Sequence, residues 1–219
     1  MRESFRVRVL IDLLRVGDVP TKLVAGNALG VISSHVDYIR PVALAGAIPL
    51  YSELLHGPEP MGKEIAEDVF CILAVAEENA TSIAEHLVQI LRGSDDEAKA
   101  AAAEVLWGLS GYEHSLSVVR NSGAIPVLVE ILTSGNLDLR EKDESEELRD
   151  NAAEALVNFS EDPLLCDRIS KALNVPSFQR MQDWLTQIRA SDAHLAASLR
   201  RMSIEQPAHL GPRSCLTLF

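Results

Sequence analysis

The chain has 219 residues, of which 47% are hydrophobic and 24% charged, and its formal net charge is −12. This composition suits a globular protein with a continuous core, whereas the negative charge disfavours nucleic acid and anionic membrane surfaces as partners. No apolar stretch approaches the about 20 residues of a membrane span, and the opening segment is too charged for a signal peptide. We therefore expect a cytoplasmic or nuclear protein with no membrane partner.

One nine-residue pattern occurs five times. The copies read AGNALGVIS at 25–33, AEDVFCILA at 66–74, AAEVLWGLS at 102–110, AAEALVNFS at 152–160 and, more weakly, LAASLRRMS at 195–203. Each follows a segment that ends in two apolar residues, at separations of 11, 11, 11, 20 and 10 residues. This regular register indicates a repeat array.

In chain order, the array divides into predicted units and a tail. They are units at about 5–34, 35–76, 77–111 and 112–161, a degenerate C-terminal cap at 162–204, and an irregular or disordered tail at 205–219. Each unit is predicted to hold three helices, although the first lacks its opening helix. Terminal units are expected to be atypical because one of their faces must meet water.

The unit 35–76 shows the layout. A first helix is predicted over about 35–45, and Gly46 breaks it because glycine permits a sharp turn. Pro49 lies in the first turn of a second helix, where proline is tolerated, and a third helix is predicted over about 63–76. The turn sequence recurs 77 residues later, at Gly123, but the unit 77–111 has Ser82-Ile83-Ala84-Glu85 there, so its turn should differ.

The third helices carry the nine-residue pattern, whose positions 1, 4, 5 and 8 are nearly always apolar. In the fourth copy these are Ala152, Ala155, Leu156 and Phe159. This spacing predicts one buried stripe along the helix. An all-α protein of stacked helices follows.

The fourth unit carries a family resemblance most clearly. The segment GAIPVLVEIL at 123–132, a loop, and then AAEALVNFS at 152–160 resemble the armadillo repeat. The resemblance extends over about 5–203 and implies a right-handed α-solenoid of three-helix repeats whose third helices line a concave groove. Proteins of this family characteristically bind peptides, helices or domains of partner proteins and are rarely catalytic.

Motifs for catalysis and cofactors are missing from the sequence. There is no phosphate loop, no dinucleotide fingerprint and no metal-spaced cluster of Cys and His. Cys71, Cys166 and Cys215 are widely spaced and odd in number, which does not suit a disulfide framework. We expect no enzyme activity, no cofactor, no metal and no small-molecule substrate.

Positions 3 and 7 of the pattern share the helix face opposite the buried stripe. Position 3 holds Asn27, Asp68, Glu104 and Glu154, and position 7 holds Val31, Ile72, Gly108 and Asn158. We predict a groove with an acidic ladder and a partly apolar floor, which would hold a protein segment with Lys or Arg and apolar residues between them. Alternatively, the acidic residues only solvate an exposed helix face.

Nuclear-import adaptors of the armadillo class have Trp at position 3 and Asn at position 7. Only Asn158 matches this ladder, and Glu154 replaces the Trp, so a receptor for nuclear-localisation signals is disfavoured. Trp107 lies at position 6. It is either a binding anchor, as exposed Trp often is, or a packing residue between units.

The fourth unit contains nine extra residues within 136–151, a stretch with seven acidic and three basic residues. It is either a solvated loop or an electrostatic lip for a basic partner, and it is expected to extend the third helix backwards through Glu144–Leu148. The ending Thr217-Leu218-Phe219 matches the termini that PDZ domains capture, although such endings also arise by chance.

Taken together, the sequence predicts a non-catalytic scaffold or adaptor. The alternatives are substrate recognition for a ubiquitin ligase and, third, an exchange-factor-like regulator of an ATPase or GTPase. No residue pattern argues for either alternative.

Overall fold

The computed structural model describes residues 2–112, 114–133 and 142–160, together with residues 165, 166, 169, 170, 180, 183 and 187. These described residues form ten α-helices and no strand. The helices are α1 (Arg2–Val16), α2 (Val19–Ser33), α3 (Val36–Leu44), α4 (Ala47–Leu55), α5 (Pro60–Leu73), α6 (Glu77–Leu91), α7 (Asp96–Leu109), α8 (Ser115–Ser122), α9 (Ala124–Thr133) and α10 (Lys142–Phe159). All ten belong to the first of two compact units, Met1–Met181.

Several predictions concern other parts of the chain. The tail, including Thr217-Leu218-Phe219, lies outside the described residues, as do most of the C-terminal cap and the residues 134–141 of the insertion. The unit boundaries stay predictions.

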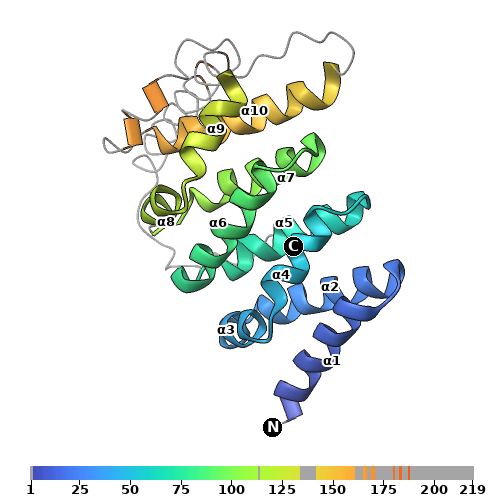
Figure 1. Ribbon diagram of the computed structural model, residues 1–219. Helices are drawn as coiled ribbons and strands as arrows, with labels where there is room; N and C mark the ends of the chain where they lie inside the picture. Colours follow the sequence, from blue (N-terminus) through green and yellow to red (C-terminus); the bar gives the residue numbers. More distant parts are fainter. Residues whose placement is uncertain are drawn as a thin grey trace, which may run out of the picture. The chain divides into compact units, whose positions relative to one another are not determined.

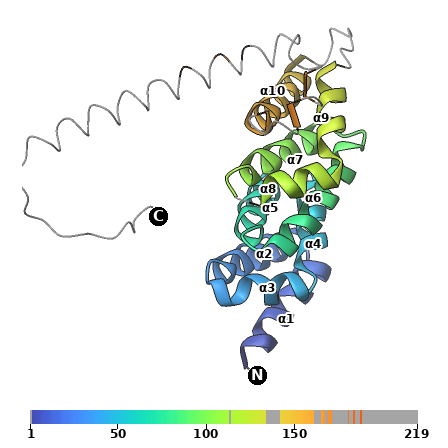
Figure 2. The ribbon, with the colours of Figure 1, turned by 90° about the vertical axis from the view of Figure 1, so that its left-hand side faces the viewer.

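The helices follow one another as a stack, from α1 at the lower end of Figure 1 to α10 at its upper end, and Figure 2 shows the same order from the side. The helices that carry the nine-residue pattern lie next to one another: α2 packs on α5, α5 on α7, and α7 on α10. The all-α solenoid predicted from the sequence is confirmed.

The apolar stripe forms the core of this stack. Positions 1, 4, 5 and 8 of the pattern are all buried in α5, α7 and α10. In α2, Ala25 and Leu29 are buried, whereas Ala28 and Ile32 are half-buried. The alanine-rich α7 buries Ala98 and Ala100–Ala103, and these small side chains let α10 approach closely.

Helix starts follow the local sequence. The Asp18 carboxylate caps α2 by accepting a hydrogen bond from the Thr21 amide at 3.0 Å, and Asp95 caps α7 through the Ala98 amide at 3.2 Å. The predicted break at Gly46 is present: its φ is 90°, and α4 begins at the next residue. Gly123 repeats this conformation with φ 79° before α9.

Each of these two turns lies beside an arginine from the preceding unit. A methyl group placed on Gly46 would lie 3.8 Å from Nη2 of Arg15, at the end of α1. One placed on Gly123 would lie 3.9 Å from Nη2 of Arg92, which caps the end of α6.

The unit 77–111 departs from the three-helix layout. Residues 82–85 lie inside the continuous helix α6, so the first two helices of this unit are merged into one. The sequence predicted a different turn there, and the structure shows that there is no turn, since the segment lacks a glycine able to adopt positive φ.

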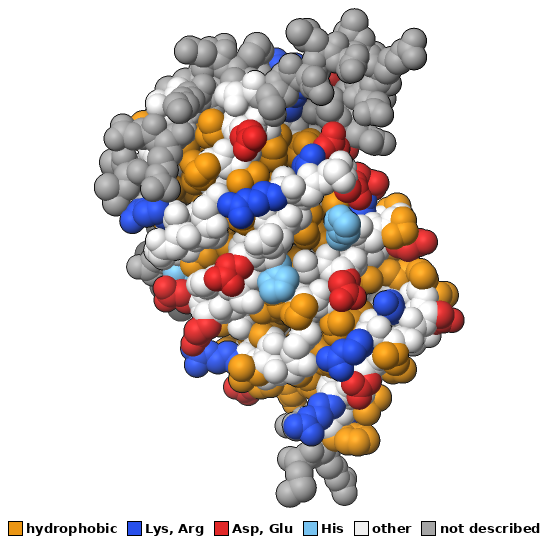
Figure 3. Space-filling model, viewed as in Figure 1, with side chains coloured by type: hydrophobic (Ala, Val, Ile, Leu, Met, Phe, Trp, Pro, Cys, Tyr) orange, Lys and Arg blue, Asp and Glu red, His pale blue; other side chains and the backbone are white. Residues whose placement is uncertain are grey.

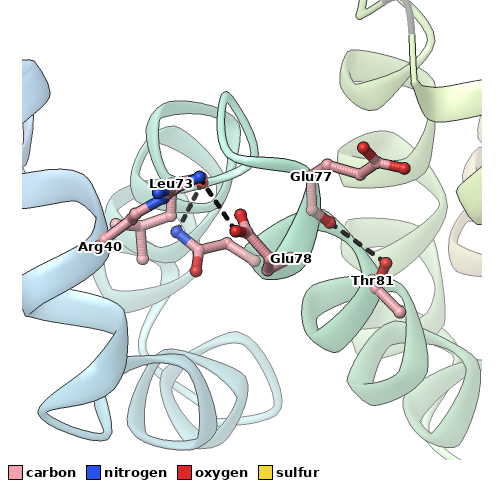
Figure 4. A network of polar contacts seen from close by, with 6 residues as sticks. Arg40, Leu73, Glu77, Glu78 and Thr81 are labelled. Carbon is pink, nitrogen blue, oxygen red and sulfur yellow. Dashed lines mark hydrogen bonds and ion pairs between the residues drawn. The ribbon is translucent and has the colours of Figure 1, made fainter.

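Polar contacts fix neighbouring units against each other. Figure 4 shows Arg40 of α3 directed toward Glu78 of α6, with 2.9 Å between Nη2 and Oε1. The buried Asn79 donates from Nδ2 to the carbonyl oxygen of Leu73 at 2.9 Å and so satisfies an acceptor at the end of α5. The Tyr51 hydroxyl of α4 donates to the Gly26 carbonyl of α2 at 2.7 Å.

Candidate functional site

The third-helix face is the surface made by positions 3 and 7 of the pattern on α2, α5, α7 and α10. Its residues are Asn27, Val31, Asp68, Ile72, Glu104, Gly108, Glu154 and Asn158. Asn27, Asp68 and Glu104 are exposed, and Glu154 is half-buried. Because the four helices are consecutive neighbours, these side chains follow one another from unit to unit.

Position 7 is more enclosed than position 3. Ile72, Gly108 and Asn158 are half-buried, whereas Val31 is exposed. The Asn158 amide donates from Nδ2 to Ser110 Oγ at 3.1 Å, which ties α10 to the end of α7. A methyl group on Gly108 would lie 3.0 Å from Cys71 Sγ, so the missing side chain allows α5 and α7 to approach.

The carboxylates on this face interact across helices. Burial raises the pKa of Glu154 on α10, and the negative charges of Glu104 and Asp150 raise it further. Glu104 lies on α7 and acts on α5 as well, where its charge contributes to the raised pKa of Glu67. The carboxylates of α5, α7 and α10 are therefore close enough to interact from one helix to the next.

The sequence did not identify Glu67. Burial is the largest cause that raises its pKa to about 7, followed by the charges of Glu104, Asp68 and Glu64, while Lys63 lowers it. Glu67 occupies position 2, where the other strong copies have the small residues Gly26, Ala103 and Ala153. A large acidic residue at a position that holds small residues in the other copies was the sequence feature that could have identified Glu67.

Lys63, one turn before Glu67, is buried and forms an ion pair with Glu97 of α7. This cation is held by the next unit. Its charge lowers the pKa of Glu67 by less than the charges of Glu104, Asp68 and Glu64 together raise it.

Trp107 is 39% exposed and lies at position 6, beside the third-helix face. Cys71, also at position 6, is half-buried, and burial together with Asp68, Glu67 and Glu104 raises its pKa to about 11. The thiol is therefore protonated at neutral pH, which leaves little of the nucleophilic thiolate.

Other kinds of site were sought in the described part of the chain. There, no group of three His, Cys, Asp or Glu residues is placed to hold a metal ion. Three cavities of about 330 to 470 Å³ lie at helix ends and turns, and Asp68, Glu104 and Glu154 line none of the three. No single described helix is long and apolar enough to cross a bilayer; Leu116–Ser122 and Ala124–Thr133 reach that criterion only as a pair bent by 72°.

The insertion is partly described. The helix α10 begins at Lys142, so the backward extension predicted through Glu144–Leu148 is present. The N-terminal half of α10 includes Asp150. The charge of Asp150 contributes to the raised pKa of Glu154, so this half of the helix adds negative charge next to the third-helix face.

Comparison with known proteins identifies the fold. No family model and no curated protein matches the chain. Among solved structures, an engineered protein is similar with 25% identity and a TM-score of 0.52, over 78% of this chain and 68% of the other. A computationally designed armadillo repeat protein for modular peptide recognition matches with 19% identity and a TM-score of 0.54, over 81% and 74%.

A second designed armadillo repeat protein, solved in complex with the peptide (KR)4, matches with 19% identity and a TM-score of 0.55, over 80% of this chain and 74% of that one. These similarities agree with the helix order and the buried stripe described above. The chain has the armadillo-like repeat fold.

Proposed function

We propose that the chain is a non-catalytic scaffold or adaptor whose third-helix face holds an extended protein segment with Lys or Arg at intervals and apolar residues between them. The observation that carries this proposal is the row of carboxylates on three successive helices, close enough for the charge of Glu104 to raise the pKa of acids on both sides. Basic side chains placed between these carboxylates relieve their mutual repulsion.

The spacing of the carboxylates suits an extended peptide. Packed helices lie about 8–10 Å apart, and an extended chain advances about 3.3–3.6 Å per residue. Every second or third residue of such a peptide therefore meets a new helix. A designed protein of the same fold is described in complex with (KR)4, a peptide of alternating Lys and Arg, which supports the choice of a basic peptide as probe.

The test compares the wild type with the combined variant Asp68→Lys, Glu104→Lys and Glu154→Lys. Binding of a fluorescent (Lys-Arg)4 peptide is measured by anisotropy at several salt concentrations. We expect the triple variant to bind at least about tenfold more weakly, with a shallower salt dependence, because the ion pairs are replaced by like charges.

A matched control reverses three exposed acidic residues away from this face, Glu53, Glu59 and Glu85, to Lys. This control has the same net charge as the first variant. An equal loss of binding in both variants would show a general charge effect, and unchanged binding in the first would remove the third-helix face as the site.

A further inference from the structure

The N-terminal end of the stack exposes an apolar stripe on α1. Phe5, Val9, Leu13 and Val16 each leave between 40% and 78% of their surface exposed, and their spacing of i, i+4, i+8 and i+11 places them on one side of the helix. The opposite side of α1 is also apolar, and its residues Val7, Ile11 and Leu14 are buried. The helix is therefore apolar on two sides, and one of them faces water.

The neighbouring helix α2 continues this surface with the exposed side chains of Val24 and Val31. Figure 3 shows hydrophobic side chains at the lower end of the view, with charged side chains of both signs among them. We call the surface made by Phe5, Val9, Leu13, Val16, Val24 and Val31 the end face.

The next unit shows what these positions do elsewhere in the stack. Leu50 and Leu54 correspond to Val9 and Leu13, since they lie 41 residues later in the sequence. Leu50 is only 6% exposed, and Leu54 is half-buried. Side-chain atoms of Leu54 and of Ile65, the counterpart of Val24, lie 3.5 and 3.4 Å from a methyl group placed on Gly26 of the preceding unit. The end face thus repeats a surface that packs between units, but here its side chains are 40% to 78% exposed.

Terminal repeats of solenoids usually present a polar outer face, which keeps the array soluble. The first unit of the described stack instead presents the apolar end face. Exposed apolar side chains that gather on one surface mark a contact site.

We propose that the end face binds the end face of a second copy of this chain, with the two α1 helices antiparallel. Arg8 and Asp12 are exposed, one helical turn apart, along one flank of the stripe. In a two-fold dimer of antiparallel helices this flank meets itself, which brings each Arg8 opposite Asp12 of the other copy. The flank is therefore complementary in charge to its own two-fold image.

Asp12 is available for this contact. Within the described residues it pairs with Arg15 at 3.5 Å, and both side chains are more than half exposed. Such an exposed pair within one helix contributes little stability. This proposal does not depend on binding at the third-helix face, with which the end face shares only Val31.

Sedimentation equilibrium of the 219-residue chain tests the proposal. We expect a species with twice the mass of the 23.9 kDa monomer. The combined variant Val9→Asp and Leu13→Asp should be monomeric, whereas Leu44→Asp, at an 88% exposed apolar residue of α3, should leave the dimer intact. Circular dichroism confirms that each variant is folded.

A wild-type monomer at concentrations up to about 100 µM, well above the Kd of most specific complexes, would overturn the proposal. So would a dimer that persists in the Val9→Asp and Leu13→Asp variant, because its contact would then lie elsewhere.

A charge exchange tests the antiparallel arrangement. Arg8→Glu or Asp12→Arg alone places like charges opposite each other twice and should raise the dimer Kd about tenfold or more. The two substitutions together restore the pairs and should return the Kd to within about threefold of the wild type. A double variant as weak as the single ones would overturn this arrangement.

Discussion

Glu67 is a half-buried carboxyl group among Glu64, Asp68 and Glu104, and its pKa is raised from 4.5 to about 7, mainly by burial. Between about pH 4.5 and pH 7, the Glu67 carboxyl group therefore holds its proton more tightly in the folded protein than in the unfolded chain. The stability that comes from the protonated form is complete below pH 4.5 and is lost as the pH rises through about 7.

Replacing Glu67 with Gln removes this charge at every pH. We expect Glu67→Gln to raise the melting temperature relative to the wild type at about pH 8, and to have little effect near pH 4.5, where Glu67 is protonated in the folded state. Thermal unfolding measured across this range checks the prediction. The control is Glu64→Gln, an exposed neighbour on α5, and a pH dependence shared by both variants would contradict the role of Glu67.

At the same scale, the sequence placed Asp68, Glu104 and Glu154 at the same position of the repeat, and helix geometry then puts that position on the same side of each helix. It could not predict the state of Glu67, which depends on burial and on Glu104 in the following unit. The exposure of Trp107 likewise depends on how successive units pack. The sequence therefore left open whether Trp107 is a binding anchor or a packing residue between units.

Among the elements, α2 and α5 are in close contact where Gly30 meets Val69. A methyl group on Gly30 would lie only 2.7 Å from Val69 Cγ2, whereas one on Gly26, on the same buried side of α2, would lie 3.4 Å from the nearest side-chain atom. The contact between these helices therefore tolerates an added methyl group at one glycine but not at the other.

We expect Gly30→Ala to destabilise the protein by about 1–3 kcal/mol through overpacking. Gly26→Ala should be neutral or stabilising by up to about 1 kcal/mol, since alanine has the higher helix propensity. Urea unfolding of both variants provides the comparison. Equal effects of the two substitutions would show that the contact between α2 and α5 adapts to the added methyl group.

The positions of the helices were largely predictable, since the predicted break at Gly46 lies directly before α4. The merged helix α6 was only partly predictable. The segment 82–85 lacks the glycine, but whether the chain turns there without one depends on packing against α7, α8 and the helices of the preceding unit. Local sequence does not contain that information.

Across the whole molecule, the neighbours of each helix differ between the middle and the N-terminal end of the stack. The helix α7 packs between α5 and α10, whereas α1 packs chiefly on α2. In a linear array, stability is approximately a sum of contributions from units and from contacts between adjacent units. The middle of the array should therefore open least often.

We expect amide hydrogen exchange to be slowest in α5–α7 and fastest in α1, as local opening follows the number of packed neighbours. The measurement uses mass spectrometry on the Val9→Asp and Leu13→Asp variant, so that contact between copies does not protect α1. Equal protection of α1 and α7 would indicate that the array unfolds as one cooperative unit.

The two arginine-flanked turns have a consequence for how such an array could be lengthened. Gly46 lies beside Arg15 and Gly123 beside Arg92. In the unit before the merged helix α6, the corresponding residue at the end of α4 is His56. Among the described residues, this glycine turn thus recurs after two units, or 77 residues. Duplicating residues 46–122 in tandem would bring Arg92 of the first copy beside Gly46 of the second, so a longer protein built in blocks of this size would preserve the pairing of arginine and glycine at each such turn.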